Sequence, residues 1–222
     1  MNNHYVSKLV VKRFSKALNV FDIHTEKITE NKNPDKVFAK KGIIDDDIEK
    51  IMNVNIESRV ANIIDQKIAD KDSVVITKDE LFVLKRYMLI NSIRSMGLDY
   101  DKFGSLMRSF LKNANQYLEI YTEYKILPDL NQVNIDNREL YQRTLKVFSS
   151  TTCIRDIAFN PLATREMIGW ALPFIESYIA FCDAPDGFEF ILTEVGMSSE
   201  YECFHQITGG IDISKVAYLL AN

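Results

Sequence analysis

The chain has 222 residues, of which 46% are hydrophobic and 26% are charged, and its formal net charge is −4 at pH 7. These values are typical of a globular protein that can bury a core, and the acidic total argues against broad, sequence-independent coating of nucleic acid. No apolar run approaches the ~20 residues that a helix needs to cross a bilayer, so we expect no membrane association.

The cysteines bear on the cellular location of the protein, and the charge distribution bears on its partners. The three cysteines are odd in number and far apart, with no C-x-x-C pair to suggest structural zinc, which favours a reduced, cytoplasmic location. Residues 1–41 hold nine Lys or Arg against four Asp or Glu, although the whole chain is acidic. This basic N-terminal region suits an anionic or phosphodiester substrate, and it equally suits a solvated surface that answers an acidic one.

The first segment, residues 3–14, is predicted to belong to the fold, because large apolar side chains recur along it and basic residues interrupt them. His4 has two ring nitrogens that can bind a metal or move a proton near neutral pH. The alternative is that His4 and Arg13 are satisfied hydrogen-bonding groups at the edge of a core. Residues 19–29 follow with β-branched residues and a turn candidate, which predict a short hairpin.

Helices are predicted for the middle of the chain. After three aspartates that suit a helix start, apolar residues recur at three- and four-residue spacing from Ile48 to Ile68. A second helix begins near Thr77, with Glu80 three residues later to complete a capping box, and runs to Arg94. Further helices are predicted over residues 101–124, 137–148, 151–159 and 164–172.

Two charged residues of these helices are candidates for chemistry. Glu57 shares a helix face with Val60 and Ile64, so its carboxylate must be paired, hold a cation or take up a proton. The structural alternative is an ion pair with Arg13 or Arg94. Arg94 lies on the apolar face of its own helix, and its planar fork suits a carboxylate and a phosphate equally well.

The last third of the chain changes to a β-rich pattern. Residues 178–182 and 188–193 are predicted to form a second hairpin, joined by the turn sequence DAPDG. Thr193 and Glu194 stand at the exit of its last strand, where side chains can be held rigidly while they face a cleft.

These elements together predict an α+β fold, in which a helical middle layer packs on a small antiparallel sheet from the N- and C-terminal thirds. We expect a single domain over residues 1–222, with a β-rich part (1–44), a helical part (45–172) and a C-terminal hairpin and tail (173–222).

Several short motifs resemble the microbial family called domain of unknown function 4238, whose members typically begin His-Tyr-Val-Pro. This chain has His4-Tyr5-Val6 followed by Ser7 in place of proline, and it then has Arg13-Phe14. The resemblance continues through VFDIHTEKI, the helix that carries Glu57, NSIRS around Arg94, and FILTEVG, which is similar to the family signature FxTSDNP. That last motif keeps Thr193 but has Glu194 in place of aspartate, and Val195-Gly196 in place of Asn-Pro. The chain is thus identified as a diverged member, and a shortened C-terminus is expected because family members continue further.

The resemblance carries no known function, but it suggests which residues meet. Its motifs fall on His4, Arg13, Glu57, Arg94 and Glu194, so we expect the fold to bring these five together. In one hypothesis they form a hydrolytic site. There, His4, Glu57 and Glu194 act as catalytic residues or hold Mg or Mn, while Tyr5, Arg13, Arg94 and Thr193 bind a phosphodiester or nucleic-acid substrate.

In the alternative hypothesis the same residues form a buried ion-pair network that fixes the fold. The protein would then be non-catalytic, such as an accessory or mobile-element protein that binds a protein partner or a second copy of itself. The predicted Tyr-rich helix, residues 101–124, would supply the interface. The replacement of aspartate by Glu194 weighs against the metal site, because the longer side chain moves the ligand oxygen. Both hypotheses stay open at this level.

Overall fold

The computed structural model describes residues 2–14, 18–22, 24–69, 71, 73–109, 135–151, 156–157, 160–176 and 179. Within these ranges the chain has the predicted α+β character, with several helices and short antiparallel strands. No helix of the described ranges combines the length and the apolarity that spanning a membrane requires.

The strands form two antiparallel ribbons. β1 (Asn2–His4) pairs with β4 (Ala39–Lys41), and β2 (Leu18–Asp22) pairs with β3 (Lys27–Lys32). The second ribbon confirms the hairpin that the sequence predicts over residues 19–29. All described strands therefore come from the first 41 residues. They form two separate ribbons, whereas the sequence predicts one small sheet. The predicted C-terminal strands lie outside the described residues, except for Ile179.

Two short helices complete the N-terminal part. α1 (Lys8–Phe14) follows β1, and the 3-10 turn η1 (Pro34–Lys36) precedes β4. The Ser7 hydroxyl accepts from the backbone N–H of Leu9, so Ser7 caps the free donors at the start of α1. A small apolar cluster lies beneath these elements and consists of Val6, Val11, Leu18 and Val37.

The predicted helix between Ile48 and Ile68 is confirmed, but it contains two π-helical turns. α2 (Asp46–Met52), the π turn η2 (Asn53–Glu57), α3 (Ser58–Ile63) and the π turn η3 (Ile64–Ile68) follow one another without a break. The apolar stripe stays buried throughout, with Ile48, Met52, Ile56, Val60, Ile64 and Ile68 all facing the core. A π turn shifts the helix by one residue, and such turns often occur at functional sites.

α4 (Lys78–Met96) is the central helix. Its start is the predicted capping box, in which the Thr77 side chain accepts from the Glu80 N–H and the Glu80 carboxylate accepts from the Thr77 N–H. Every residue from Val83 to Arg94 is buried, because other helices cover α4 on several sides. Polar residues on this segment therefore have to find partners within the protein.

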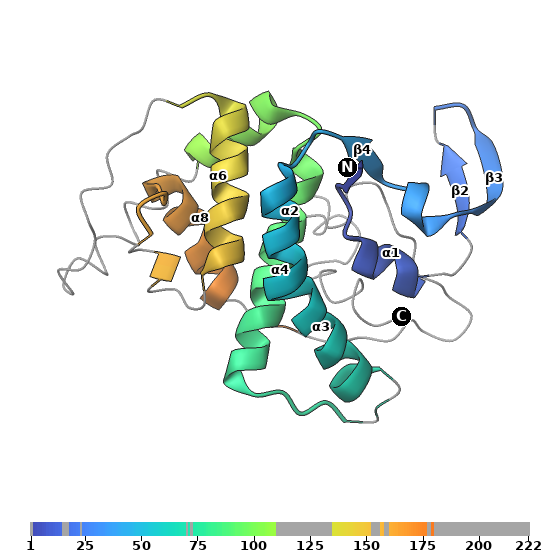
Figure 1. The fold of residues 1–222 in the computed structure, drawn as a ribbon, viewed down its shortest axis with the longest axis horizontal. Coiled ribbons are helices and arrows are strands. Elements are labelled where there is room, and N and C mark those ends of the chain that lie inside the picture. Colours follow the sequence, from blue (N-terminus) through green and yellow to red (C-terminus); the bar gives the residue numbers. More distant parts are fainter. Residues whose placement is uncertain are drawn as a thin grey trace, which may run out of the picture.

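α4 is surrounded by the other helices. It contacts α3, the η2 turn, α6 (Asn137–Ser150) and α8 (Arg165–Glu176), and Figure 1 shows α2, α4 and α6 side by side with the β2–β3 ribbon at the far end of the molecule. α6 confirms the helix predicted over residues 137–148. Residues 100–109 are helical, and the rest of the predicted helix 101–124 lies outside the described residues.

Candidate functional site

Arg94 is the centre of a buried ion-pair network. Its guanidinium is 1% exposed and uses all three nitrogens: Nη1 donates to Glu57 Oε1, Nη2 donates to Glu49 Oε1 at 2.7 Å, and Nε donates to the His4 backbone carbonyl at 2.9 Å. The Ser7 hydroxyl adds a second hydrogen bond to Glu57 Oε1 at 2.9 Å. These contacts tie β1 and the segment before α1 to two turns of the long helix and to α4.

The electrostatics of this network are those of charges removed from water. Burial acts to lower the pKa of Arg94, but Glu57 and Glu49 outweigh it, so the pKa is raised and the guanidinium stays charged. Burial raises the pKa of Glu49, and the Arg94 charge opposes this only in part. The pKa of His4 is lowered by burial first, and then by the charges of Arg94 and Lys8.

Several buried polar atoms around Arg94 lack a hydrogen-bond partner among the described residues. They are Asn3 Nδ2, His4 Nε2, Glu49 Oε2, Tyr87 Oη and Asn91 Oδ1. Burial raises the pKa of the Tyr87 phenol, and the nearby Glu57 carboxylate raises it further. The network thus contains many polar groups, and its charged centre is the Arg94 cation between the Glu49 and Glu57 carboxylates.

The structure places three of the predicted site residues together and two elsewhere. His4, Glu57 and Arg94 meet as described. Arg13 instead forms an ion pair with the exposed Asp65, in which Nη2 lies 2.7 Å from both carboxylate oxygens. The Tyr5 ring packs edge-on against Phe38 with ring centroids 6.0 Å apart.

The remaining predicted residues, Thr193 and Glu194, lie outside the described residues. Among the residues that the structure describes, no group of three or more His, Cys, Asp or Glu side chains is arranged to hold a metal ion. The predicted metal site depends on Glu194, so it stays a prediction.

Glu49 is the partner of Arg94 that the sequence did not single out. It lies in the first turns of α2, among acidic residues that read as favourable charge at a helix start. The sequence could have identified Glu49 from its position eight residues before Glu57. In a helix with a continuous apolar stripe, both carboxylates lie near the same edge of that stripe.

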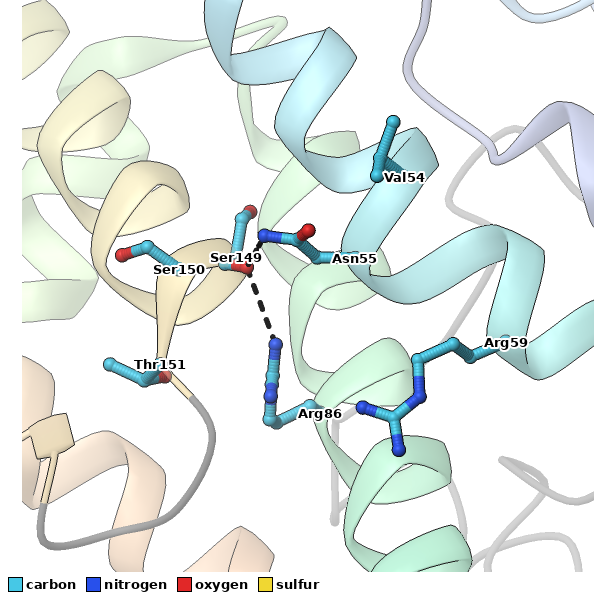
Figure 2. Close-up of a pocket in the computed structure, with 7 residues that line it drawn as sticks. All are labelled: Val54, Asn55, Arg59, Arg86, Ser149, Ser150 and Thr151. Carbon is cyan, nitrogen blue, oxygen red and sulfur yellow. Dashed lines mark hydrogen bonds between the residues drawn. The ribbon is translucent and has the colours of Figure 1, made fainter.

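A second group of polar residues surrounds a pocket of about 230 Å³ on the opposite side of the η2 turn. We call it the Arg86 pocket, and Figure 2 shows its lining residues, Val54, Asn55, Arg59, Arg86, Ser149, Ser150 and Thr151. They come from η2, α3, α4 and the end of α6. The Ser149 carbonyl accepts from Arg86 Nη2 and from Asn55 Nδ2, both at 3.3 Å.

Arg86 is a buried cation with little compensation. It is 2% exposed, its Nε has no hydrogen-bond partner among the described residues, and the ion pairs found there do not include it. Its guanidinium lies 5.7 Å from the centre of the Phe82 ring. Burial lowers the pKa of Arg86 to about 10, the charge of Arg59 adds to this, and the carboxylate of Asp156 opposes it. In Figure 2 the Arg59 guanidinium points toward Arg86.

The sequence did not single out this pocket. Arg86 and Arg59 read as ordinary surface charges of amphipathic helices, and Asn55 as a polar residue between apolar ones. Arg86 lies eight residues before Arg94, a little over two turns along α4, so the two do not share one face, and Arg86 is buried because other helices cover α4 on several sides.

A family described as "Protein of unknown function (DUF4238)" matches residues 2–207. No curated protein and no solved structure matches this chain.

Proposed function

Because this chain belongs to the DUF4238 family, whose description states no activity, its role has to be inferred from its own residues, and we propose that it binds a small anionic ligand in the Arg86 pocket. The observation that carries this proposal is the buried Arg86 guanidinium, which lines the pocket and forms no ion pair among the described residues. A buried charge is costly unless an opposite charge compensates it. A bound anion would supply that compensation.

Arg59 strengthens the case for an anion. Arg59 is exposed and lines the same pocket. Among the described residues, its side chain forms no hydrogen bond and no ion pair. Two like charges close together repel each other, and here the repulsion adds to the lowered pKa of Arg86. An anion between the two guanidinium groups would turn this repulsion into two attractions, with the geometry that arginine forks offer to oxygen atoms.

Anion binding in the Arg86 pocket is favoured over hydrolysis at the cluster of His4, Glu57 and Arg94. Glu57 Oε1 accepts from Arg94 and from Ser7, so this oxygen is already engaged and is poorly placed to activate water. Each nitrogen of Arg94 already donates a hydrogen bond within the protein, and the side chain is 1% exposed, so a substrate phosphate has little access to it. These contacts support the hypothesis in which the cluster fixes the fold. A hydrolytic site that also uses Glu194 stays a prediction, as does a role in binding another protein.

Calorimetric titration with inorganic phosphate at low ionic strength tests the proposal. We expect the wild type to bind phosphate and the variants Arg59→Met and Arg86→Met each to bind it at least ~10-fold more weakly, since a hydrogen bond to a charged group contributes about 1.5–3 kcal/mol. Raising the salt concentration should weaken binding, because part of the attraction is electrostatic.

Arg138→Met is the matched control. Arg138 is an exposed arginine that pairs with Asp45 at 3.0 Å and does not line the Arg86 pocket, so its replacement should leave phosphate affinity unchanged. The proposal is wrong if the wild type gives no heat with phosphate, or if Arg138→Met weakens binding as much as Arg59→Met does.

A further inference from the structure

The first 41 residues pack largely among themselves, and we infer that they form a lid, which opens over the Arg94 network while the helices stay folded. We call the described residues between Asn2 and Lys41 the N-terminal lobe. The lobe contains both ribbons, α1 and η1, and Figure 1 shows it on one side of α2, α3 and α4. Its opening exposes polar side chains that the closed structure keeps out of water.

The lobe has an apolar cluster that is separate from the main core. The four buried residues of this cluster all belong to the lobe, and they are Val6, Val11, Leu18 and Val37. Among the described residues of the lobe, Val10 alone is buried in the main core, with Tyr5 and Leu9 at its edge. Four buried side chains are too few to keep about 40 residues folded without further support. Opening therefore means that the lobe unfolds locally while the main core remains.

Polar contacts attach the lobe to the helices. Arg94 Nε donates to the His4 carbonyl at 2.9 Å, and the Ser7 hydroxyl donates to Glu57 Oε1 at 2.9 Å. The exposed ion pair of Arg13 adds little, because water screens it. The attachment thus depends mainly on the buried Arg94 network, which the lobe covers.

Several buried polar atoms near this boundary have no partner among the described residues. They are Asn3 Nδ2, His4 Nε2, Glu49 Oε2, Tyr87 Oη and Asn91 Oδ1. The first two belong to β1 of the lobe. Tyr87 and Asn91 lie seven and three residues before Arg94, so they share with it the face of α4 that meets the lobe. Each such atom gains a hydrogen bond to water when the lobe opens, and one unpaired buried group shifts an equilibrium by roughly 5- to 150-fold.

Residues 42–45, which join β4 to α2, provide a hinge. Gly42 has φ +73°, it is exposed, and no atom lies within 4 Å of the position that a Cβ would occupy. Glycine adopts many backbone conformations at little cost, so the chain direction can change here without disturbing α2. The Gly42 N–H donates to Asn3 Oδ1 at 3.1 Å, and this contact breaks when the lobe opens.

Hydrogen exchange of the full chain, followed by mass spectrometry, tests the inference. This measurement reports the free energy with which each backbone N–H becomes accessible to water. We expect the amides of residues 2–14 and 37–41 to share one level of protection, at least ~10-fold below that of residues 83–94 in α4. Equal protection of the lobe and of α4 in the wild type would overturn the inference.

Two matched valine variants separate local opening from global unfolding. Val37→Ala weakens the apolar cluster of the lobe, which is lost in both processes, so the lobe and α4 should lose protection by the same factor. Val147→Ala weakens α6 within the main core, which stays intact when only the lobe opens. In this variant α4 should lose protection and the lobe should not.

A milder variant covers the case in which Val147→Ala does not fold. Ile168→Val removes one methylene group from a buried side chain of α8, and it should lower the protection of α4 by roughly 2- to 12-fold without affecting the lobe. If the lobe loses as much protection as α4 in either main-core variant, the chain unfolds as one unit and the inference is overturned.

Discussion

Arg86 and Arg94 lie on the same helix, eight residues apart, and both are almost fully buried, yet only Arg94 forms ion pairs with carboxylates among the described residues. Glu49 and Glu57 neutralise Arg94, and the His4 carbonyl accepts from its Nε, so each of its three nitrogens already donates within the protein. Arg86 faces a second arginine and a pocket. We therefore expect Arg94 to contribute to stability and Arg86 to contribute to anion binding, although both are arginines with similar burial.

The first prediction concerns the stability of the two arginine variants. Arg94→Met should lower the free energy of unfolding by about 3–5 kcal/mol, because it leaves two carboxylates buried without their cation. Arg86→Met should stay within about 1 kcal/mol of the wild type, because it replaces a poorly compensated buried charge with an apolar side chain of similar length. Urea denaturation followed by circular dichroism measures both values.

A combined variant provides the control for this prediction. Adding Glu49→Gln and Glu57→Gln to Arg94→Met removes the unpaired carboxylates, so the triple variant should recover part of the lost stability. Equal losses for Arg86→Met and Arg94→Met would contradict the assignment of one arginine to the fold and the other to the pocket.

The second prediction concerns pH. The pKa of His4 is lowered in the folded protein, so between that value and about pH 6.5 the unfolded state binds more protons than the folded state. His4 therefore destabilises the fold as pH falls through this window, with a slope of at most ~1.4 kcal/mol per pH unit. His4→Gln should flatten the dependence of the unfolding free energy on pH in this range.

The difference between the two pH profiles isolates His4. Glu49 acts in the opposite sense, because its raised pKa lowers stability as pH rises above about 4.5, but this contribution is present in both proteins. A His4→Gln profile parallel to that of the wild type would refute the prediction.

The third prediction concerns the start of α4. Thr77→Ala removes the side-chain oxygen that accepts from the Glu80 N–H at 3.3 Å, and it should cost about 1 kcal/mol of stability. The Glu80 carboxylate, whose pKa is lowered to about 2 first by Lys67 and then by the Thr77 N–H, should stay charged at neutral pH and keep its half of the capping box. Ser73→Ala, an exposed change in the preceding segment, should cost almost nothing when both are compared by thermal unfolding.

The fourth prediction concerns two buried glycines. A Cβ on Gly97 would overlap the Tyr141 hydroxyl, which donates to the Arg94 carbonyl at 3.1 Å, and it would also overlap Ile43. Gly97→Ala should therefore cost about 1–3 kcal/mol, as overpacking in a core typically does. Gly104→Ala is the comparison, because the atoms nearest to its Cβ belong to the Asn137 side chain, which is held only by exposed hydrogen bonds to Asp101 and Arg108 among the described residues. Equal unfolding free energies for the two variants would show that the Tyr141 contact has no special cost.

The fold was largely predictable where local signals agree with burial. The capping box at Thr77 and Glu80 identified the start of α4, and the continuous apolar stripe from Ile48 to Ile68 identified the long helix. The π turns within that helix were not predicted, since an insertion of one residue barely changes the apolar pattern. The pairing of β1 with β4 was not predicted either, because the partners are about 37 residues apart and no short turn fixes their register.

The candidate sites divide in the same way. The sequence by itself determined that Glu57 and Arg94 lie on buried helix faces and need charge partners, because helical periodicity places side chains relative to a core. Only the tertiary structure decided that Glu49 shares Arg94, that Arg13 turns outward to Asp65, and that Arg86 meets Arg59 across a pocket. The physical reason is that pairing between charges depends on distance across helices packed together, and one-dimensional spacing carries no information about that distance.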